Sequence, residues 1–240
     1  MSRFIAVSGK GGVGKTTLAA LLITRLIRRG CKPVLAVDAD PNACLDAALG
    51  VQVRKSLGTV REEAREIAGK GMATGIAKQQ LLEMKIAESL VEATDFDLIS
   101  MGRPEGPGCY CAANHMLRRS IDRLGNEYAA VVIDNEAGME HISRQTTRDV
   151  DWLFILSDPT QRGLAAAEHI MELVRELGTR IGHAGLLINR ARGELPTTLA
   201  QRVAQLPVPL LGLLPQDAAV AECDAEGRPL VTLDETSQIY

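Results

Sequence analysis

Short apolar runs recur along the chain, and most of them do not alternate with polar residues. Runs of this kind are typical of strands that are buried on both faces of a parallel sheet, because a half-exposed strand alternates instead. We therefore expect buried strands at residues 4–7, 34–37, 98–100, 128–133, 152–156 and 184–188. A further apolar run, residues 210–214, is followed by a proline.

Helical patterns fill the intervals between these runs. Residues 18–29 and 161–177 have such patterns, and a glycine suited to a helix C-terminus follows each of them. Residues 75–94 form a clear amphipathic pattern, whereas residues 53–67 follow the helical period more loosely. The alternation of strands and helices predicts an α/β fold, with a doubly wound, mostly parallel sheet and right-handed crossovers.

Length and linker composition predict one domain. The chain has 240 residues, enough for one substantial core, and no Pro- or Ser-rich linker divides it. We expect residues 1–240 to form a single domain. The sequence from Thr232 onward predicts no element and no role.

The segment SGKGGVGKTT, residues 8–17, lies between the first apolar run and the first helical pattern. It matches the phosphate-loop template GxxxxGK[ST] in the strand-then-helix context that the template requires. The alternative interpretation of this segment is an ordinary glycine-rich turn. Glycines let the backbone direct its N–H groups at phosphate oxygens, and the helix N-terminus adds partial positive charge. Lys15 is expected to reach the β and γ phosphates, and the Thr16 hydroxyl to hold Mg²⁺. The expected ATP-contacting residues here are Gly9, Gly11, Gly12, Val13, Gly14, Lys15, Thr16 and Thr17.

Two aspartates follow the second expected strand. Asp38 and Asp40 come directly after residues 34–37. Ligands of open α/β sheets bind at the carboxyl ends of the strands, so we expect both carboxylates beside the phosphates. Asp38 is expected to help hold the Mg²⁺ shell. Asp40 is expected to position the attacking water rather than to act as a strong base, since an ordinary aspartate has a pKa of about 3.9. The alternative for this stretch is a solvated turn.

A third aspartate, Asp134, closes the apolar run 128–133. An acid in this place downstream of a phosphate loop is typical of a Walker B residue that holds Mg²⁺ through water. Asp134 and Gly138 have the DxxxG spacing of a switch II segment, in which the Gly138 N–H approaches the γ-phosphate. Glu136 and Glu140 are expected on the surface of that segment. Asp158 precedes a proline and is interpreted as a turn residue, with an acid of the following helix region or an acid near the metal as the alternative.

The loop at residues 102–119, GRPEGPGCYCAANHMLRR, contains Cys109 and Cys111, and its later part looks helical. Residues two apart in extended backbone project to the same side, so both thiolates can approach one metal ion. Two thiolates fill half of a tetrahedral site, and a two-fold axis in a homodimer would supply the other half. Thiolates suit Zn²⁺, Ni²⁺ or an iron–sulfur cluster. Two buried small residues or a redox pair are the alternatives, and His115 is interpreted as a surface helical residue rather than a further ligand.

Composition and charge narrow the class of protein. A net charge of −3 and seven aromatic residues (one Trp, three Tyr and three Phe) argue against nucleic-acid binding. The N-terminal sequence does not resemble a signal peptide, and no apolar run approaches the roughly 18 residues that span a bilayer, so we expect a cytoplasmic protein without membrane association. Five cysteines favour thiol or metal chemistry over a disulfide framework. Cys31, Cys44 and Cys223 are isolated and are expected to be small apolar fillers.

The loop GKGGVGKT resembles the deviant Walker A signature of the ATPase family that includes MinD, ParA, the nitrogenase iron protein and ArsA. The resemblance implies that Lys10 crosses a homodimer interface to the partner's phosphates, in the manner of an arginine finger; a solvated loop lysine is the alternative. It also strengthens Asn189, with Arg190 beside it, as a base-recognition candidate, because an amide both donates and accepts. Otherwise Asn189 is a turn residue. A second adenine-contacting loop is implied at Leu214, Pro215 and Asp217.

Within that family, three features together look like the CooC-type ATPases, which assist nickel insertion into carbon monoxide dehydrogenase. They are the CxC loop, DNEAGMEHISR after the run 128–133, and SDPTQRG after the run 152–156. The resemblance implies a dimer that ATP closes, a Ni²⁺ or Zn²⁺ site shared across it by Cys109 and Cys111, and carbon monoxide dehydrogenase as partner. An iron–sulfur carrier or reductase like the nitrogenase iron protein, and a positioning switch of the MinD or ParA type, are the alternatives.

Overall fold

The structure is a computed structural model that describes residues 2–69, 78–103, 111–137 and 149–239. The expected residues Cys109, Gly138 and Glu140 therefore lie outside the described residues, and Cys111 is described only as a backbone position. Among the helices that are described, none is long and apolar enough to cross a membrane.

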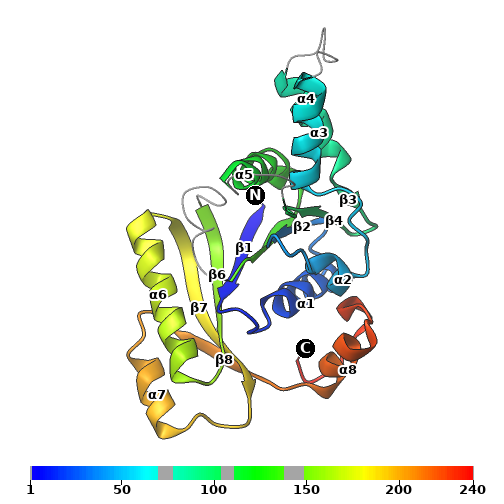
Figure 1. Ribbon diagram of the computed structural model, residues 1–240. Coiled ribbons are helices and arrows are strands. Elements are labelled where there is room, and N and C mark those ends of the chain that lie inside the picture. Colours follow the sequence, from blue (N-terminus) through cyan, green and yellow to red (C-terminus); the bar gives the residue numbers. More distant parts are fainter. Residues whose placement is uncertain (1, 70–77, 104–110, 138–148, 240) are drawn as a thin grey trace.

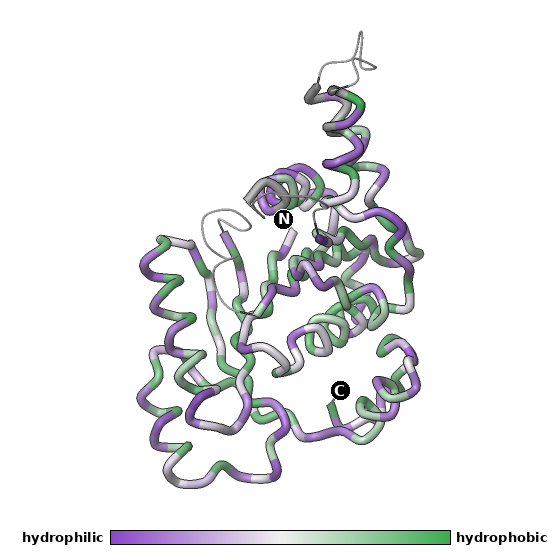
Figure 2. The backbone as a smooth tube through the Cα atoms, viewed as in Figure 1, coloured by the Kyte–Doolittle hydropathy of each residue, from purple (hydrophilic) through white to green (hydrophobic). Residues whose placement is uncertain are grey.

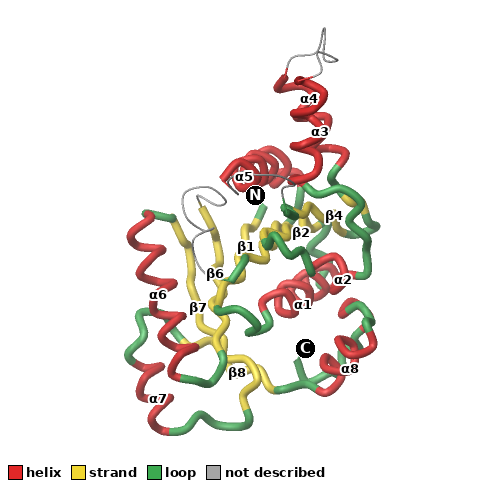
Figure 3. The backbone as a smooth tube through the Cα atoms, viewed as in Figure 1, coloured by secondary structure: helices red, strands yellow, loops and turns green. Residues whose placement is uncertain are grey.

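One sheet runs through the molecule, in the strand order β3-β4-β2-β5-β1-β6-β7-β8 (Figures 1 and 3). Its strands are β1 (Arg3–Gly9), β2 (Val34–Ala39), β3 (Val91–Glu92), β4 (Phe96–Ser100), β5 (Ala130–Asn135), β6 (Asp149–Ser157), β7 (Arg180–Ala191) and β8 (Leu210–Pro215). Every pairing between these strands is parallel except β3 with β4. The expected fold class, a doubly wound and mostly parallel sheet, is confirmed.

Helices cover both faces of the sheet (Figure 1). They are α1 (Lys15–Arg28), α2 (Leu45–Leu49), α3 (Leu57–Gly69), α4 (Lys78–Glu88), α5 (Cys111–Leu124), α6 (Gln161–Leu177), α7 (Thr197–Ala204) and α8 (Ala218–Glu226), with 3-10 turns η1 (Gly125–Glu127) and η2 (Leu230–Thr232). Helix α6 has the expected bounds, and Gly178 ends it in the left-handed conformation that glycine tolerates best.

The two sides of the sheet form two hydrophobic cores. Ile5 and Val7 of β1 point to the side of α1, α2 and η2, whereas Ala6 between them points to the side of α3, α5, α6 and α7. Successive side chains of a strand point to opposite faces, so a strand covered on both faces needs apolar residues at every position. Figure 2 shows this as green along the central strands.

The expected helix at residues 75–94 is wrong at its C-terminal end. Helix α4 stops at Glu88, and the chain then forms β3, where Val91 lies opposite Leu98 of β4 in an antiparallel pair. The hydrogen-bonding groups at the edge of β4 favour this short strand, and β-branched Val91 suits it. The amphipathic pattern alone did not reveal the neighbouring edge.

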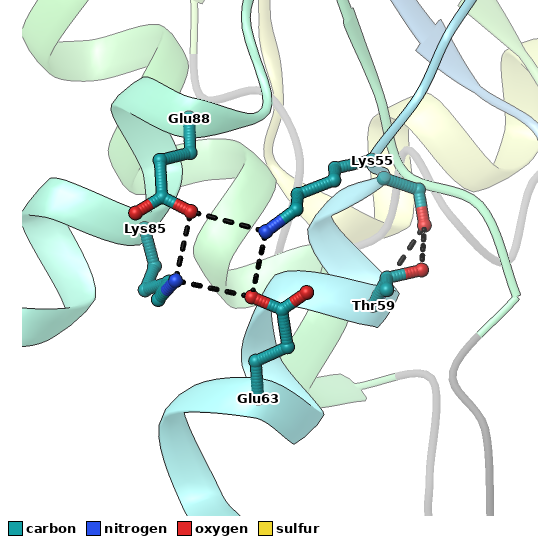
Figure 4. A network of polar contacts seen from close by, with 6 residues as sticks. Lys55, Thr59, Glu63, Lys85 and Glu88 are labelled. Atoms are coloured by element: carbon teal, nitrogen blue, oxygen red, sulfur yellow. Dashed lines mark hydrogen bonds and ion pairs between the residues drawn. The ribbon is translucent and has the colours of Figure 1, made fainter. Parts of the chain in front are cut away.

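Helices α3 and α4 form a hairpin that projects from the body of the molecule (Figure 1). Figure 4 shows a ring of charges across it: Lys55 Nζ lies 2.9 Å from Glu63 Oε2 and 3.2 Å from Glu88 Oε2. Lys85 Nζ lies 3.1 Å from the same oxygen of Glu63 and 2.8 Å from that of Glu88. The hydrogen bonds from Lys55 and Lys85 lower the pKa of Glu63. The ring ties the two helices together at a partly exposed position, where Lys85 is the most covered of the four side chains.

We expect the Glu63→Gln variant to loosen this hairpin without unfolding the protein. Loss of one carboxylate leaves both lysines with only Glu88, so amide hydrogen exchange in α3 and α4 should become roughly two- to fivefold faster at low salt. The difference should shrink at high salt because exposed ion pairs are screened. Glu62→Gln, which alters the neighbouring pair with Arg61, is the matched control. Equal exchange in wild type and Glu63→Gln at low salt would contradict a stabilising role for the ring.

Candidate nucleotide and magnesium site

The phosphate loop connects the end of β1 to the start of α1. Gly14 has a φ of 99°, and a Cβ built there would lie 2.6 Å from Asn189 Nδ2, so both conformation and space require glycine. The Gly14 carbonyl accepts the first intrahelical bond of α1, from Leu18 N–H at 2.9 Å. The N-terminus of α1 therefore opens directly at the loop, as an anion site requires.

Lys15 is 8% exposed, and its Nζ donates to the Lys10 carbonyl at 3.4 Å. Burial lowers the pKa of Lys15, while the nearby charges of Asp134 and Asp40 oppose that shift. The Lys15 side chain thus folds back over the loop, and several carboxylates lie near it. Its charge is poorly solvated, which favours an incoming polyphosphate as its partner.

Two buried carboxylates lie side by side at the carboxyl ends of adjacent strands. Asp38 of β2 is the register partner of Asp134 of β5, and each is 1% exposed. Burial is the main cause that raises the pKa of Asp38 to about 6 and that of Asp134 to about 7. Two acids in such a place are poorly tolerated as anions unless a cation lies beside them.

The surroundings of Asp134 fit Mg²⁺. Its Oδ2 accepts a hydrogen bond from Thr16 Oγ1 at 2.6 Å, whereas its Oδ1 is buried without a hydrogen-bond partner among the described residues. A buried oxygen with free lone pairs, next to a hydroxyl, is the ligand type that Mg²⁺ prefers together with waters and substrate phosphates. Thr16 and Asp134, which were predicted from two distant motifs, are in direct contact.

Asp38 and Asp40 have additional structural contacts that the sequence did not indicate. Asp38 accepts backbone N–H groups from Leu45 at 3.0 Å and from Asp40 at 3.1 Å, which fixes the start of α2. Asp40 is only partly buried, and its Oδ1 accepts the Asn42 backbone N–H at 2.8 Å. The loop after β2 is therefore held by the same two acids that face the phosphate loop.

Lys10 forms an ion pair within its own chain. Its Nζ lies 2.9 Å from Asp158 Oδ2, and the two side chains are 41% and 25% exposed. Asp158 also accepts from Thr160 Oγ1 at 2.6 Å, and Thr160 caps α6 through Gly163 N–H. Asp158 is thus more than the predicted turn residue. The two residues are separated by 148 positions, so no local pattern could have paired them.

A cavity of about 810 Å³ extends from the phosphate loop toward α8. Of the predicted residues, it is lined by Gly14, Thr16, Thr17, Asn189, Arg190, Pro215 and Asp217. Leu214 instead packs against the core beneath it. The cavity is further lined by residues without a sequence signal, among them Cys44, Ala47, Val220, Cys223 and Ile239. Its volume lies in the range of about 300–1,000 Å³ that small-molecule sites have.

The predicted base-recognition residues already have partners in this structure. Asn189 Nδ2 donates to the Val13 carbonyl at 2.8 Å, which ties β7 to the phosphate loop. Asp217 caps α8, because its Oδ1 accepts the Ala219 N–H at 2.8 Å. Any contact of the Asn189 amide with a base therefore uses its remaining hydrogen-bonding capacity or exchanges the Val13 contact.

The cysteines fall into different environments. Cys223 is buried, as expected of an apolar filler, but Cys44 is exposed on the cavity wall, because it precedes α2 at the open end of the loop after β2. His115 is exposed on α5, as expected. In the described ranges, no three His, Cys, Asp or Glu side chains are grouped as a metal site would require. The thiolate site predicted at Cys109 and Cys111 falls outside this observation.

A phosphate loop between the first strand and first helix, with buried acids on the neighbouring strands, defines the class of P-loop nucleoside triphosphatases. Residues 4–230 match the CobQ/CobB/MinD/ParA nucleotide-binding domain, and the chain belongs to this family. The resemblance to MinD and ParA that was expected from the loop is thereby confirmed.

Three relatives place the chain within the family. An uncharacterised ATP-binding protein of Methanocaldococcus jannaschii is 42% identical, over 98% of this chain and 93% of that protein. The carbon monoxide dehydrogenase accessory protein CooC of Rhodospirillum rubrum is 34% identical, over 94% of this chain and 87% of that protein. The crystal structure of the cell division ATPase MinD of Pyrococcus furiosus matches 99% of this chain and 93% of its own with a TM-score of 0.71, at 26% identity.

We expect the Asp134→Asn variant to be more stable than wild type without Mg²⁺ and nucleotide, and more so at pH 8 than at pH 5. Because the pKa of Asp134 is higher in the folded state, protonation of its carboxyl stabilises the folded wild type. That stabilisation of wild type is fully present below about pH 4 and is lost as pH rises through about 7. The amide carries no charge, and the expected gain at pH 8 is about 1–3 kcal/mol. Urea unfolding at the two pH values measures it.

The same variant should lose the Mg²⁺-dependent part of ADP affinity, which isothermal titration calorimetry with and without EDTA measures. A gain in stability that is equal at pH 5 and pH 8, or an unchanged Mg²⁺ dependence, would contradict the assignment of Asp134.

Proposed function

We propose that the protein is an ATPase that hydrolyses ATP in a nucleotide-linked homodimer and assists nickel insertion into carbon monoxide dehydrogenase. The proposal takes residues 1–240 as one ATPase domain. Its main support is the combination of Lys10 with the Cys109–Tyr110–Cys111 motif in a chain 34% identical to CooC of Rhodospirillum rubrum along most of its length. The phosphate-loop signature that contains Lys10 is common to the family, and the CxC motif is the more specific of the two features.

In the proposed mechanism, the loop N–H groups and Lys15 bind the phosphates, and Asp40 positions the attacking water. Thr16, Asp134 and Asp38 are the residues that would hold Mg²⁺, the last two through their buried carboxylates. Bound Mg²⁺ supplies charge neutralisation on the phosphate oxygens. Gly138 is the proposed sensor of the γ-phosphate, whose loss releases the segment that follows it.

Lys10 is proposed to exchange partners during the cycle. In the single chain it is neutralised by Asp158, so it makes no net contribution of positive charge at the loop. The γ-phosphate bound by a second protomer carries more negative charge than one carboxylate. The Lys10–Asp158 ion pair is also exposed enough to dissociate. In the dimer each Lys10 would then stabilise charge that develops on the partner's phosphates.

The metal is proposed to be cargo held between the two protomers. Cys109 and Cys111 of each chain would provide four thiolates around the two-fold axis, a set that suits Ni²⁺ or Zn²⁺. Closure of the dimer by ATP would assemble the site, and hydrolysis would open it and release the metal to carbon monoxide dehydrogenase. An iron–sulfur cluster on the same thiolates is the chemical alternative.

A second candidate function, a positioning switch, is favoured by the likeness to MinD of Pyrococcus furiosus at 26% identity. The two functions share the ATP cycle and differ in what the dimer binds. Co-sedimentation with lipid vesicles or DNA in the presence of ATP and Mg²⁺ would support the switch, whereas ATP-dependent metal binding by the thiolates would support the metallochaperone.

We expect the Cys109→Ser/Cys111→Ser double variant to lose metal. Wild type with ATP and Mg²⁺ should bind about one Ni²⁺ or Zn²⁺ per dimer, because each chain supplies half of the ligands. Gel filtration coupled to elemental analysis measures both the metal and the dimer, and Cys31→Ser is the matched control. The metal role fails if the double variant keeps the wild-type stoichiometry. A brown anaerobic preparation with visible absorbance would favour the cluster instead.

We expect Lys10→Ala to lower the ATPase rate about 10²–10³-fold while ADP affinity changes less than about threefold, since Lys10 acts on the partner's phosphates. Asp158→Asn should release Lys10 and allow dimers to form at a lower ATP concentration. Steady-state hydrolysis and analytical ultracentrifugation measure the two effects. A Lys10→Ala variant that hydrolyses ATP at the wild-type rate would rule out the cross-subunit role.

A further inference from the structure

The segment of residues 234–239, for which the sequence predicted no role, folds back against the nucleotide site. After η2, Leu233 is buried, and a turn follows in which Thr236 N–H donates to Asp234 Oδ1 at 2.8 Å. Figure 1 shows the end of the chain between α1 and α8. The 234–239 segment thus connects the helix that follows the phosphate loop with the helix that follows β8.

Asp217 anchors the far end of the 234–239 segment. While its Oδ1 caps α8, its Oδ2 accepts the Ile239 backbone N–H at 3.2 Å and also the Ser237 hydroxyl. One carboxylate therefore joins the loop after β8 to a stretch about twenty residues downstream. Hydrogen bonds to a charged acceptor are stronger than those between neutral groups, so this anchor is well suited to fix Ile239.

Helix α1 anchors the near end. Arg28 donates to the Leu233 carbonyl at 2.8 Å, and its guanidinium lies 3.7 Å from the Glu235 carboxylate. Leu230 and Leu233 are buried in the same core as α1. Since α1 begins at Lys15, one helix contacts both the phosphate end of the cavity and the 234–239 segment.

Ile239 is the part of the 234–239 segment that reaches the cavity. It lines the same space as Asn189, Arg190 and Pro215, while Gly14 and Thr17 line the phosphate end. A partly exposed branched apolar side chain at a cavity wall offers a flat base a surface that water otherwise covers. It offers nothing to a bare phosphate chain.

We infer that Ile239 forms a wall of the nucleotide's base subsite, in contact with the base, and that the 234–239 segment and its anchor Asp217 position it. The inference rests on the proposed binding of ATP at this phosphate loop. Through its contact with the base, Ile239 makes the protein bind a nucleoside polyphosphate more tightly than an inorganic polyphosphate. It also gives Asp217 a positioning role through the 234–239 segment, in addition to its place in the predicted adenine loop.

The test uses the full-length chain and two probes, ADP and inorganic tripolyphosphate, by isothermal titration calorimetry with Mg²⁺. Ile239→Ser should weaken ADP binding about tenfold and leave tripolyphosphate binding unchanged, because only ADP carries a base. Gln238→Ser is the matched control. Its side chain is exposed, it neighbours Ile239, and it does not line the nucleotide cavity, so both affinities should stay as in wild type.

Amide hydrogen exchange of the Ile239 region gives an independent readout of positioning. ADP should slow exchange there in wild type, and tripolyphosphate should not. Asp217→Asn should reduce the ADP-dependent protection. Ser237→Ala, which removes one hydroxyl and leaves the α8 cap intact, should do so in part and covers the case in which Asp217→Asn fails to fold.

The outcomes separate this inference from the function on which it rests. If wild type binds both probes and Ile239→Ser binds ADP as wild type does, the role of the 234–239 segment is overturned while the nucleotide site stands. If wild type binds neither probe, the proposed ATPase function fails and this inference with it. A selective loss of ADP affinity, with tripolyphosphate retained, supports the inference.

Discussion

The site depends on two carboxylates that are buried beside each other where β2 and β5 end. Asp38 and Asp134 are register partners in a region that excludes water, so their negative charge is costly to the folded chain on its own. Lys15 lies near Asp134 but is itself poorly solvated. The chain thus buries two acids and a lysine in one place, and burial disfavours the charged form of all three. A polyphosphate with a bound divalent cation would balance both kinds of charge, because the cation pairs with the carboxylates and the phosphates pair with Lys15.

The loops around these acids follow from the same constraint. Asp38 holds the start of α2 through the Leu45 N–H, and Thr16 at the start of α1 donates to Asp134. The phosphate loop, the loop after β2 and the end of β5 therefore meet at one pair of carboxylates. A change of charge at that point would act on the phosphate loop and on the loop after β2 together, as a charge-driven switch requires.

Charge is also balanced locally at the surface of the site. Lys10 pairs with Asp158 at the start of the α6 segment, so the lysine that the family resemblance assigns to a partner subunit has a partner of its own in one chain. At the other end of the cavity, Asp217 joins α8 to Ser237 and Ile239. In both places one aspartate connects segments that are distant in sequence, and each connection lies at an edge of the nucleotide cavity or loop.

Much of the framework was predictable from local sequence. Non-alternating runs located the buried strands because a strand covered on both faces leaves no position for a polar residue, and the phosphate loop was recognisable from its glycines and its context. The boundary between α4 and β3 was not predictable, since it depends on the open edge of β4. The exposure of Cys44 was missed because burial of a lone cysteine depends on its neighbours in space.

The sequence by itself determined the fold class, the phosphate loop and the acids at the strand ends, because each rests on residues within a few positions of one another. Only the tertiary structure decided which of these residues touch: Thr16 with Asp134, Lys10 with Asp158, and Asp217 with Ile239. Such contacts join residues of different elements and leave no periodicity in the chain. They become visible only when the parallel sheet brings the carboxyl ends of its strands to one edge.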